Sequence, residues 1–439
     1  MLCHLLDLES AYTKVYLSLI LRISIQSHLL GDVAVFLFQE RVSKIKRVAL
    51  VGYGFLLSAI IGVIAAIFLI LEGFTSELVW SSNNRLLESM LVIGGSFILY
   101  FLLKRWPDLP KTSQDSMREL KLNKTIDYHD VFFNLLITLV ILSFGSGVGP
   151  EAALLSAIIS LSIWQADKLR YLYFQYDELK KLPLHETLKR LLNPFKFQQK
   201  YVGATAPKIP SVIKQKRVLY PVFIVNGILA FALLIRQTDQ PSFIIKLGQS
   251  NWQLVDIWLL PILMIVGIIF GELCKLFYKV FHMWINKTNF PLALKIGLGA
   301  IVIILISYLA PDLLFLGQHS LNLLINGWDH KSVGFLISMG IIKLLFLAWC
   351  LNFNWRGGHI FPITFAAMIE GFAVAQMLPN FDRLFVVAVI ATTIMSELIS
   401  PVGAGIFIML FFPLKLTPII ILVAILMYLK NKIGFKKRV

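Results

Sequence analysis

Two short stretches of this sequence decide how the chain can fold. The first is Phe144-Gly-Ser-Gly-Val-Gly-Pro-Glu151, and the second is Trp355-Arg-Gly-Gly-His-Ile-Phe-Pro362. Glycines allow a tight turn whose N–H groups face one point, and proline is favoured at the first position of a helix, where its missing N–H costs nothing. Each stretch therefore predicts a loop that ends in a helix N-terminus, and such an end attracts an anion.

The composition around these loops is typical of a protein that crosses a membrane several times. The 439 residues are 57% hydrophobic and 15% charged, whereas soluble domains carry about a quarter charged residues. Residues Val48–Leu71 hold no charge over 24 positions, which is enough for a hydrocarbon core of about 30 Å. A soluble globular enzyme is therefore excluded, and no metal motif, nucleophile elbow or phosphate loop favours any enzyme.

Many of the apolar runs are short and end at Gly or Pro. Ala152–Trp164 and Phe361–Leu378 are examples of 13 and 18 residues, too short to span a bilayer upright without their polar flanks. Such runs are typical of channels and secondary transporters, in which broken helices meet near the midplane to hold an ion. Ordinary packed helices with uncertain ends are the alternative. Because residues 48–217 and 218–430 each contain one Gly-Pro loop, the sequence also indicates an internal repeat.

The charge pattern orients these halves in the membrane. The formal net charge is +16, and residues 167–217 hold 12 Lys and Arg against 4 Asp and Glu. The positive-inside rule places this basic loop in the cytoplasm, where it either binds anionic lipid head groups or is simply solvated. The predicted organisation of this multi-pass plasma-membrane protein is an amphipathic cytoplasmic segment at 1–47, repeat halves at 48–217 and 218–430, and a basic cytoplasmic tail at 431–439.

The cysteines predict neither a disulfide framework nor a metal site. Cys3, Cys274 and Cys350 are separated widely and form no CxxC or Cys/His spacing. We expect them to be small apolar residues, and we expect no metal and no cofactor.

The order and spacing of the motifs resemble the CLC family of chloride channels and chloride/proton exchangers. Gly149-Pro150 matches the end of that family's G-K/R-E-G-P motif, and Gly358-His-Ile-Phe-Pro362 matches its G-x-F-x-P motif. Residues 400–405 are similar to the later A-P-L-T-G helix start. The resemblance covers residues 48–430. It implies an all-α, inverted-repeat membrane protein with broken helices, a divergent bacterial-type member that forms a homodimer with one anion pathway per subunit.

The resemblance also implies where the anion binds. In this family the ion is coordinated largely by backbone N–H groups at helix N-termini, which by position belong here to His359 and Ile360, with residues 147–150 forming the opposite wall. The candidate pathway residues are Ser113, Gly147, Val148, Gly149, Pro150, Gly357, Gly358, His359, Ile360, Phe361 and Pro362.

The sequence departs from the family at several places. Val148 occupies the position of the gating glutamate, and valine can neither fill an anion site nor carry a proton. The G-S-G-I-P motif is replaced by residues 111–117, with Ser113 as the nearest counterpart of its serine, and the central tyrosine of the last helix has no clear match. The polar residues 167–217 stand where the first-half counterpart of the broken helix at 400–414 is expected. The first repeat is therefore predicted to be incomplete.

Four charged residues and a histidine have two interpretations each. Glu151 either caps the helix that it begins or acts as a displaced protonatable group beside the anion path. Glu370 and Glu397 are functional if they lie inside the membrane, and otherwise they are interfacial. His359 either tunes the anion site or packs against the glycine turn, and Arg356 either attracts anions or ends the preceding helix.

Together these observations predict CLC-like transport of chloride or a similar small anion, in a channel-like or weakly proton-coupled manner. Two alternatives remain. The chain is either a non-conducting relative that lost its pore with the missing helix and acts as a membrane partner or regulator, or an unrelated permease.

Overall fold

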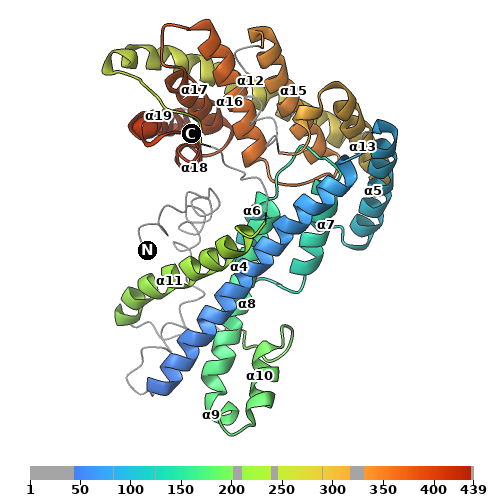
Figure 1. The fold of residues 1–439 in the computed structure, drawn as a ribbon, viewed down its shortest axis with the longest axis vertical. Helices are drawn as coiled ribbons and strands as arrows, with labels where there is room; N and C mark the ends of the chain where they lie inside the picture. Colours follow the sequence, from blue (N-terminus) through green and yellow to red (C-terminus); the bar gives the residue numbers. More distant parts are fainter. Residues whose placement is uncertain are drawn as a thin grey trace.

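The computed structural model describes residues 44–82, 84–123, 125–200, 210–238, 246–288, 290–316 and 331–436. In these ranges the chain is built from helices and turns, with a single isolated bridge between two residues in place of any sheet (Figure 1). Most of the predicted amphipathic segment, residues 1–43, lies outside the described residues, as do residues 437–439 of the predicted tail.

The first half begins with α4 (Lys44–Trp80), the longest helix among the described residues. Its elements are α4 (Lys44–Trp80), α5 (Arg85–Arg105), α6 (Ser113–Asn123), α7 (Val131–Ser143), α8 (Glu151–Phe174), α9 (Tyr176–Leu179), α10 (Leu184–Leu192) and α11 (Pro210–Ile235). Local signals explain the boundaries of α5. The Asn84 side chain accepts a hydrogen bond from the Leu86 N–H at the start, and Lys104 and Arg105 lie in the last turn, where they suit the helix dipole.

The second half follows the same plan with better-capped helices. Its elements are the 3₁₀ turn η2 (Leu254–Leu259), α12 (Leu260–Lys287), α13 (Leu292–Leu309), η3 (Pro311–Leu313), α15 (Val333–Asn352), α16 (Ile360–Met377), α17 (Arg383–Leu398), α18 (Pro401–Ile408), η5 (Leu414–Leu416) and α19 (Thr417–Lys436). The side chains of Ser332, Asp382 and Ser400 cap α15, α17 and α18 by accepting from backbone N–H groups of the first turn.

Eight helical segments in the described residues are long and apolar enough to cross a membrane. Large apolar side chains are exposed along the outer faces of α5 and α12, among them Phe97, Phe101, Ile265 and Phe277. Apolar faces that extend over whole helices are unfavourable in water, and in a bilayer lipid chains cover them. The chain is therefore an all-α, multi-pass membrane protein.

The predicted repeat is visible in the order of the helices. The series α4, α5, α7 and α8 has its counterpart in α12, α13, α15 and α16, and in both series a glycine-rich loop precedes the last helix. The equivalent helices α5 and α13 pack against each other and join the two halves (Figure 1, right).

The halves differ after α8 and α16, in the region where the sequence predicts that the first-half counterpart of residues 400–414 is missing. In the second half, α17 is buried at every residue from Leu384 to Glu397 because α12, α16, α18 and α19 surround it. At the corresponding place in the first half the described chain forms only the short helices α9 and α10, and α10 contains no buried residue.

Two boundaries differ from the sequence-based expectation. The basic loop was expected to start at Asp167, but α8 continues to Phe174 because its charged residues find partners. Arg170 Nη1 lies 2.6 Å from Asp167 Oδ1, and Lys168 donates to backbone carbonyls, so burying these groups costs much less than burying free charges. Similarly, α11 begins at Pro210, inside the predicted loop and before the expected boundary between the halves at 218.

Candidate functional site

The two Gly-Pro loops meet, although more than 200 positions separate them in the sequence. The Gly149 N–H donates to the Gly358 carbonyl at 2.9 Å, and the Gly358 N–H donates to the Gly149 carbonyl at 2.7 Å. Glycine is required for this approach, because a Cβ atom on Gly358 would lie 2.1 Å from the carboxyl carbon of Glu151. The structure thus brings the helix starts of α8 and α16 together at the junction of the halves.

The first two backbone amides of α16 have no acceptor within their own helix. We expected a helix start at Pro362, but α16 begins at Ile360. Proline is tolerated in the first turn, where its missing N–H would have had no partner. The first N–H that returns to the loop is that of Ile363, which donates to the His359 carbonyl at 3.1 Å. The amides of Ile360 and Phe361 therefore remain available to an acceptor from outside the helix.

The carboxylate of Glu151 is that acceptor. Its Oε1 atom accepts hydrogen bonds from the Ile360 N–H at 2.9 Å and from the Phe361 N–H at 3.3 Å. Glu151 is only 6% exposed, and its Oε2 atom has no hydrogen-bond partner among the described residues. A carboxylate at a helix N-terminus is stabilised by the dipole and by charge-assisted hydrogen bonds.

This arrangement differs from the interpretation that Glu151 caps its own helix, because its carboxylate reaches the start of α16 in the other half. The other interpretation, a protonatable group beside the anion path, stays a prediction. The engaged amides are those of Ile360 and Phe361, one position further along than His359 and Ile360. The signal for this site is the glutamate directly after Pro150, but no local rule reveals which helix it caps.

The wall opposite the amides is formed by the first loop. Val148 is fully buried and packs against Gly357, where a Cβ atom would lie 2.3 Å from a methyl group of the valine. The Gly147 N–H donates to Cys350 Sγ at 3.3 Å, which ties the loop to the end of α15. Gly145 adopts a φ angle of +80°, a conformation that favours glycine.

The other candidate residues lie at different places. Arg356 is exposed. Glu397, near the end of α17, is paired with Lys275 and Lys430, which gives it a structural role between helices. Glu370 is buried in α16 beside Gly340 of α15, and neither of its oxygens has a hydrogen-bond partner among the described residues.

Ser113 is the first residue of α6 and is half-buried. Ser116 and Ser156 join α6 to α8 through hydroxyl oxygens 2.7 Å apart, so α6 lies against the helix that carries Glu151. Cys274 and Cys350 are free thiols, and Cys3 lies outside the described residues.

One cavity reaches the start of α16. It has a volume of about 420 Å³ and lies between α12 and α15. Its walls are mostly apolar, and Cys274 and Leu345 contribute to them; at one end it contacts His359 and Gln114, the neighbour of Ser113. The described chain gives neither the His359 ring nor the Gln114 amide a hydrogen-bond partner, so both can contact a polar solute in this cavity.

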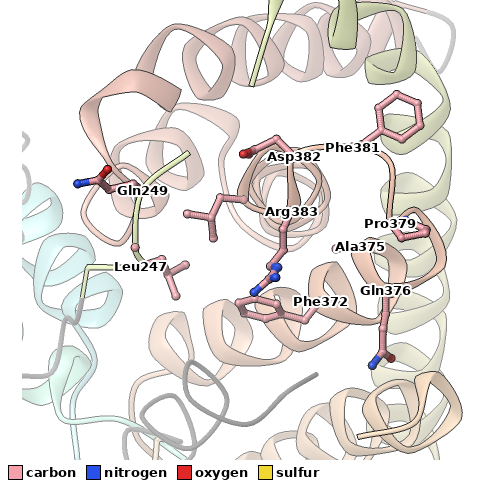
Figure 2. Close-up of a pocket in the computed structure, with 11 residues that line it drawn as sticks. Leu247, Gln249, Phe372, Ala375, Gln376, Pro379, Phe381, Asp382 and Arg383 are labelled. Carbon is pink, nitrogen blue, oxygen red and sulfur yellow. The ribbon is translucent and has the colours of Figure 1, made fainter. Parts of the chain in front are cut away.

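A second cavity lies at the opposite end of α16. It has a volume of about 580 Å³ and is lined by residues 247–249, by the last turn of α16 and by the start of α17. Figure 2 shows Arg383 extending into the space between Leu247 and Phe372. Because a helix rises about 1.5 Å per residue, the 18 residues of α16 separate this cavity from the amides, and it does not contain the candidate site.

Comparisons with known proteins bear on the family and the fold of the chain. Residues 214–430 match the family model described as voltage gated chloride channel, whereas a comparison with curated protein sequences gives no match.

Among solved structures, a CLC-type fluoride/proton antiporter is similar with a TM-score of 0.58 and 16% identity, over 89% of this chain and 96% of the other. A slow cyanobacterial Cl⁻/H⁺ antiporter gives 0.58 and 15%, over 86% and 94%. A eukaryotic CLC transporter gives 0.54 and 13%, over 86% and 70%.

At such low identity these structures establish the fold and not the substrate. The family model covers about half of the chain, the half that contains α16 and the amides that the Glu151 carboxylate engages. Residues 214–430 therefore match the voltage gated chloride channel family, and the chain shares the fold of CLC antiporters over most of its length.

Proposed function

We propose that this protein moves chloride or a similar small anion across a membrane, and that the amides of Ile360 and Phe361 form the binding site. The observation that supports this proposal is the position of the Glu151 carboxylate, which accepts hydrogen bonds from both amides. A site that holds a tethered carboxylate has the donors and the dipole to hold a free anion.

In this mechanism Glu151 is the gate. Its carboxylate and the transported ion compete for the same two amides, so an anion binds only when the side chain moves away. Protonation removes the negative charge of the carboxyl group and converts charge-assisted hydrogen bonds into weaker neutral ones. We therefore expect the anion flux to rise as the pH falls.

We further propose that coupling to protons is weak. Val148 supplies no titratable group on the wall opposite the amides, so the carboxyl group of Glu151 is the single titratable group of the proposed gate. Transport is then channel-like, or exchanges protons in a loose ratio to anions. The cavity beside His359 supports this mechanism because it brings a solute-sized space next to the first turn of α16.

The cellular setting of the proposal is a plasma membrane in which the chain acts as a homodimer with one pathway per subunit. The incomplete first repeat favours a second function, that of a non-conducting relative that acts as a membrane partner or regulator. In that case Glu151 closes the site permanently.

The test is anion flux from liposomes that contain the purified protein, with valinomycin present to balance the charge. We expect chloride efflux above that of empty vesicles, faster efflux for Glu151→Ala, and efflux of Glu151→Gln that no longer depends on pH. Glu178→Gln, which changes an exposed glutamate on α9, is the matched control and should behave as the unmodified protein. Equal rates for empty vesicles, the unmodified protein and Glu151→Ala would refute transport and establish the non-conducting alternative.

A further inference from the structure

The helix α10 presents an uncovered row of leucines. Leu184, Leu188 and Leu192 are 76%, 46% and 54% exposed, and their spacing of four residues places them on one side of the helix. None of the nine residues of α10 is buried. Such a continuous apolar strip in a chain that lies beside a bilayer requires a covering surface.

The opposite side of α10 is charged and mainly basic. Glu186 and Arg190 lie there, Lys189 lies at the edge between the two sides, and Lys180 and Lys181 precede the helix in the short α9–α10 turn. A short helix with leucines on one side and lysine or arginine on the other is typical of segments that lie in the interface of a membrane.

Several hydrogen bonds fix α10 beside the ends of the membrane-spanning helices. The Thr187 hydroxyl donates to the Leu179 carbonyl at 3.0 Å, and the Tyr53 hydroxyl of α4 donates to the Leu191 carbonyl at 2.8 Å. Figure 1 shows α9 and α10 together at the far end of α8, near the start of α4.

The segment after α10 returns to α8 and is held there. Lys168 donates to the carbonyls of Asn193 and Lys196, and the Trp164 indole N–H donates to the Pro194 carbonyl at 2.8 Å. The leucine row therefore cannot turn inward onto the protein without breaking these contacts at both ends of α10.

We propose that α10 lies in the membrane interface, with Leu184, Leu188 and Leu192 among the acyl chains and its basic residues against anionic phospholipid head groups. The charge of the region supports this occupant, since residues 167–217 hold 12 Lys and Arg against 4 Asp and Glu, and each basic residue near an anionic surface is attracted to it. The helix thereby anchors the part of the first half that follows α8, whereas in the second half α16 is followed by the buried helix α17. This inference does not depend on the proposed transport function.

The test places an environment-sensitive NBD probe on the full chain in vesicles. In a Cys3→Ser, Cys274→Ser background, Leu188→Cys carries the probe on the apolar side of α10 and Glu186→Cys carries it on the opposite side as the matched control. The vesicles contain phosphatidylcholine with or without phosphatidylglycerol, and a parallel set contains lipids brominated on their acyl chains.

We expect the probe at position 188 to emit at shorter wavelength and to be quenched by brominated chains, more strongly when phosphatidylglycerol is present. The probe at 186 should instead be quenched by acrylamide from the water. The double variant Lys189→Glu, Arg190→Glu should lose the extra quenching that phosphatidylglycerol gives.

Three results would overturn the proposal. The probe at 188 could be quenched by acrylamide and not by brominated chains, which means solvation. Its emission could shift in detergent only as the protein concentration rises, which means that a second copy covers α10. Quenching of the double variant that equals that of the parent in phosphatidylglycerol would exclude recognition of anionic lipid.

Discussion

The two halves hold the same kind of helix start by different means. In the second half α16 packs against α17, which is buried from Leu384 to Glu397. Apolar packing therefore fixes the direction of the α16 N-terminus. In the first half α8 packs against α4, α6 and α7, and beyond these helices it meets a strap, residues 193–199, that is held by side-chain hydrogen bonds. A half that loses a packed helix can thus keep its geometry with polar contacts.

Each half buries one lysine completely for a related purpose. Lys168 of α8 binds the strap through two carbonyls, and Lys343 of α15 binds the carbonyls of Leu313 and Phe315. A buried ammonium group is tolerated only when its donors are satisfied. Substitutions of the two lysines therefore test how much the stability of each half depends on polar contacts.

The largest effect should come from the backbone bridge between Gly149 and Gly358, which joins the two halves. Gly358→Val adds a side chain that starts 2.1 Å from the Glu151 carboxyl carbon, which forces the loops apart and moves the Ile360 and Phe361 amides. Overpacking of this kind costs about 1–3 kcal/mol. Because about 1.4 kcal/mol is a factor of ten, we expect anion flux from liposomes to fall on the order of tenfold or more.

The matched control for this variant is Gly297→Val on α13, where a Cβ atom meets nothing within 4 Å. It should keep both the flux and the thermal unfolding midpoint of the unmodified protein. Unchanged flux in Gly358→Val would show that the close contact between the two loops is not part of the transport site.

The next effect compares the two buried lysines. Lys343→Met leaves carbonyls unpaired in a buried environment, at a cost of about 1–3 kcal/mol each. Lys168→Met frees carbonyls of Asn193 and Lys196 that water can reach, since Lys196 is exposed. We expect Lys343→Met to lower the unfolding midpoint in detergent more than Lys168→Met does.

Proteolysis should give the opposite order. Lys168→Met releases the strap, so trypsin should cut it after Lys196 sooner than in Lys343→Met. Lys279→Met, which changes an exposed lysine on α12, should alter neither measurement. Equal trypsin sensitivity of both variants would mean that apolar packing alone holds the strap.

A smaller effect should come from the cavity beside His359, which is lined by residues of the second half and by Gln114 of the first. Leu345 lines it and is 47% exposed, whereas Leu305 on α13 is 51% exposed and lies elsewhere. Leu345→Trp should slow chloride efflux severalfold by narrowing the space, and Leu305→Trp should not.

Modification of Cys274 in the same wall by a small thiol reagent should slow efflux in the unmodified protein and leave Cys274→Ser unaffected. Equal efflux in both tryptophan variants would move the path away from this cavity.

Much of the fold could be predicted from the sequence because glycine and proline act locally. The loops at 144–151 and 355–362 follow from backbone rules, and the polar stretch between α8 and α11 follows from the length of apolar runs. The end of α8 could not be predicted, since Asp167 and Arg170 resemble loop residues until their pairing at 2.6 Å is known. The reach of Glu151 to an amide 209 residues away also escapes any local rule.

The smallest effect concerns the helix caps and tests whether polar contacts matter equally in both halves. Asn84 caps only its own helix, α5, through the Leu86 N–H, so Asn84→Ala should cost about 1 kcal/mol. Asp382 caps α17 through the Phe385 N–H at 2.8 Å and also accepts from the Ser250 hydroxyl and the Asn251 N–H, both at 2.7 Å. Asp382→Ala therefore removes three hydrogen bonds at one carboxylate and should lower the unfolding midpoint more than Asn84→Ala. Equal unfolding midpoints for the two variants would mean that packing holds the loop at 250–251. Polar contacts would then contribute little to the stability of the second half, as the burial of α17 suggests.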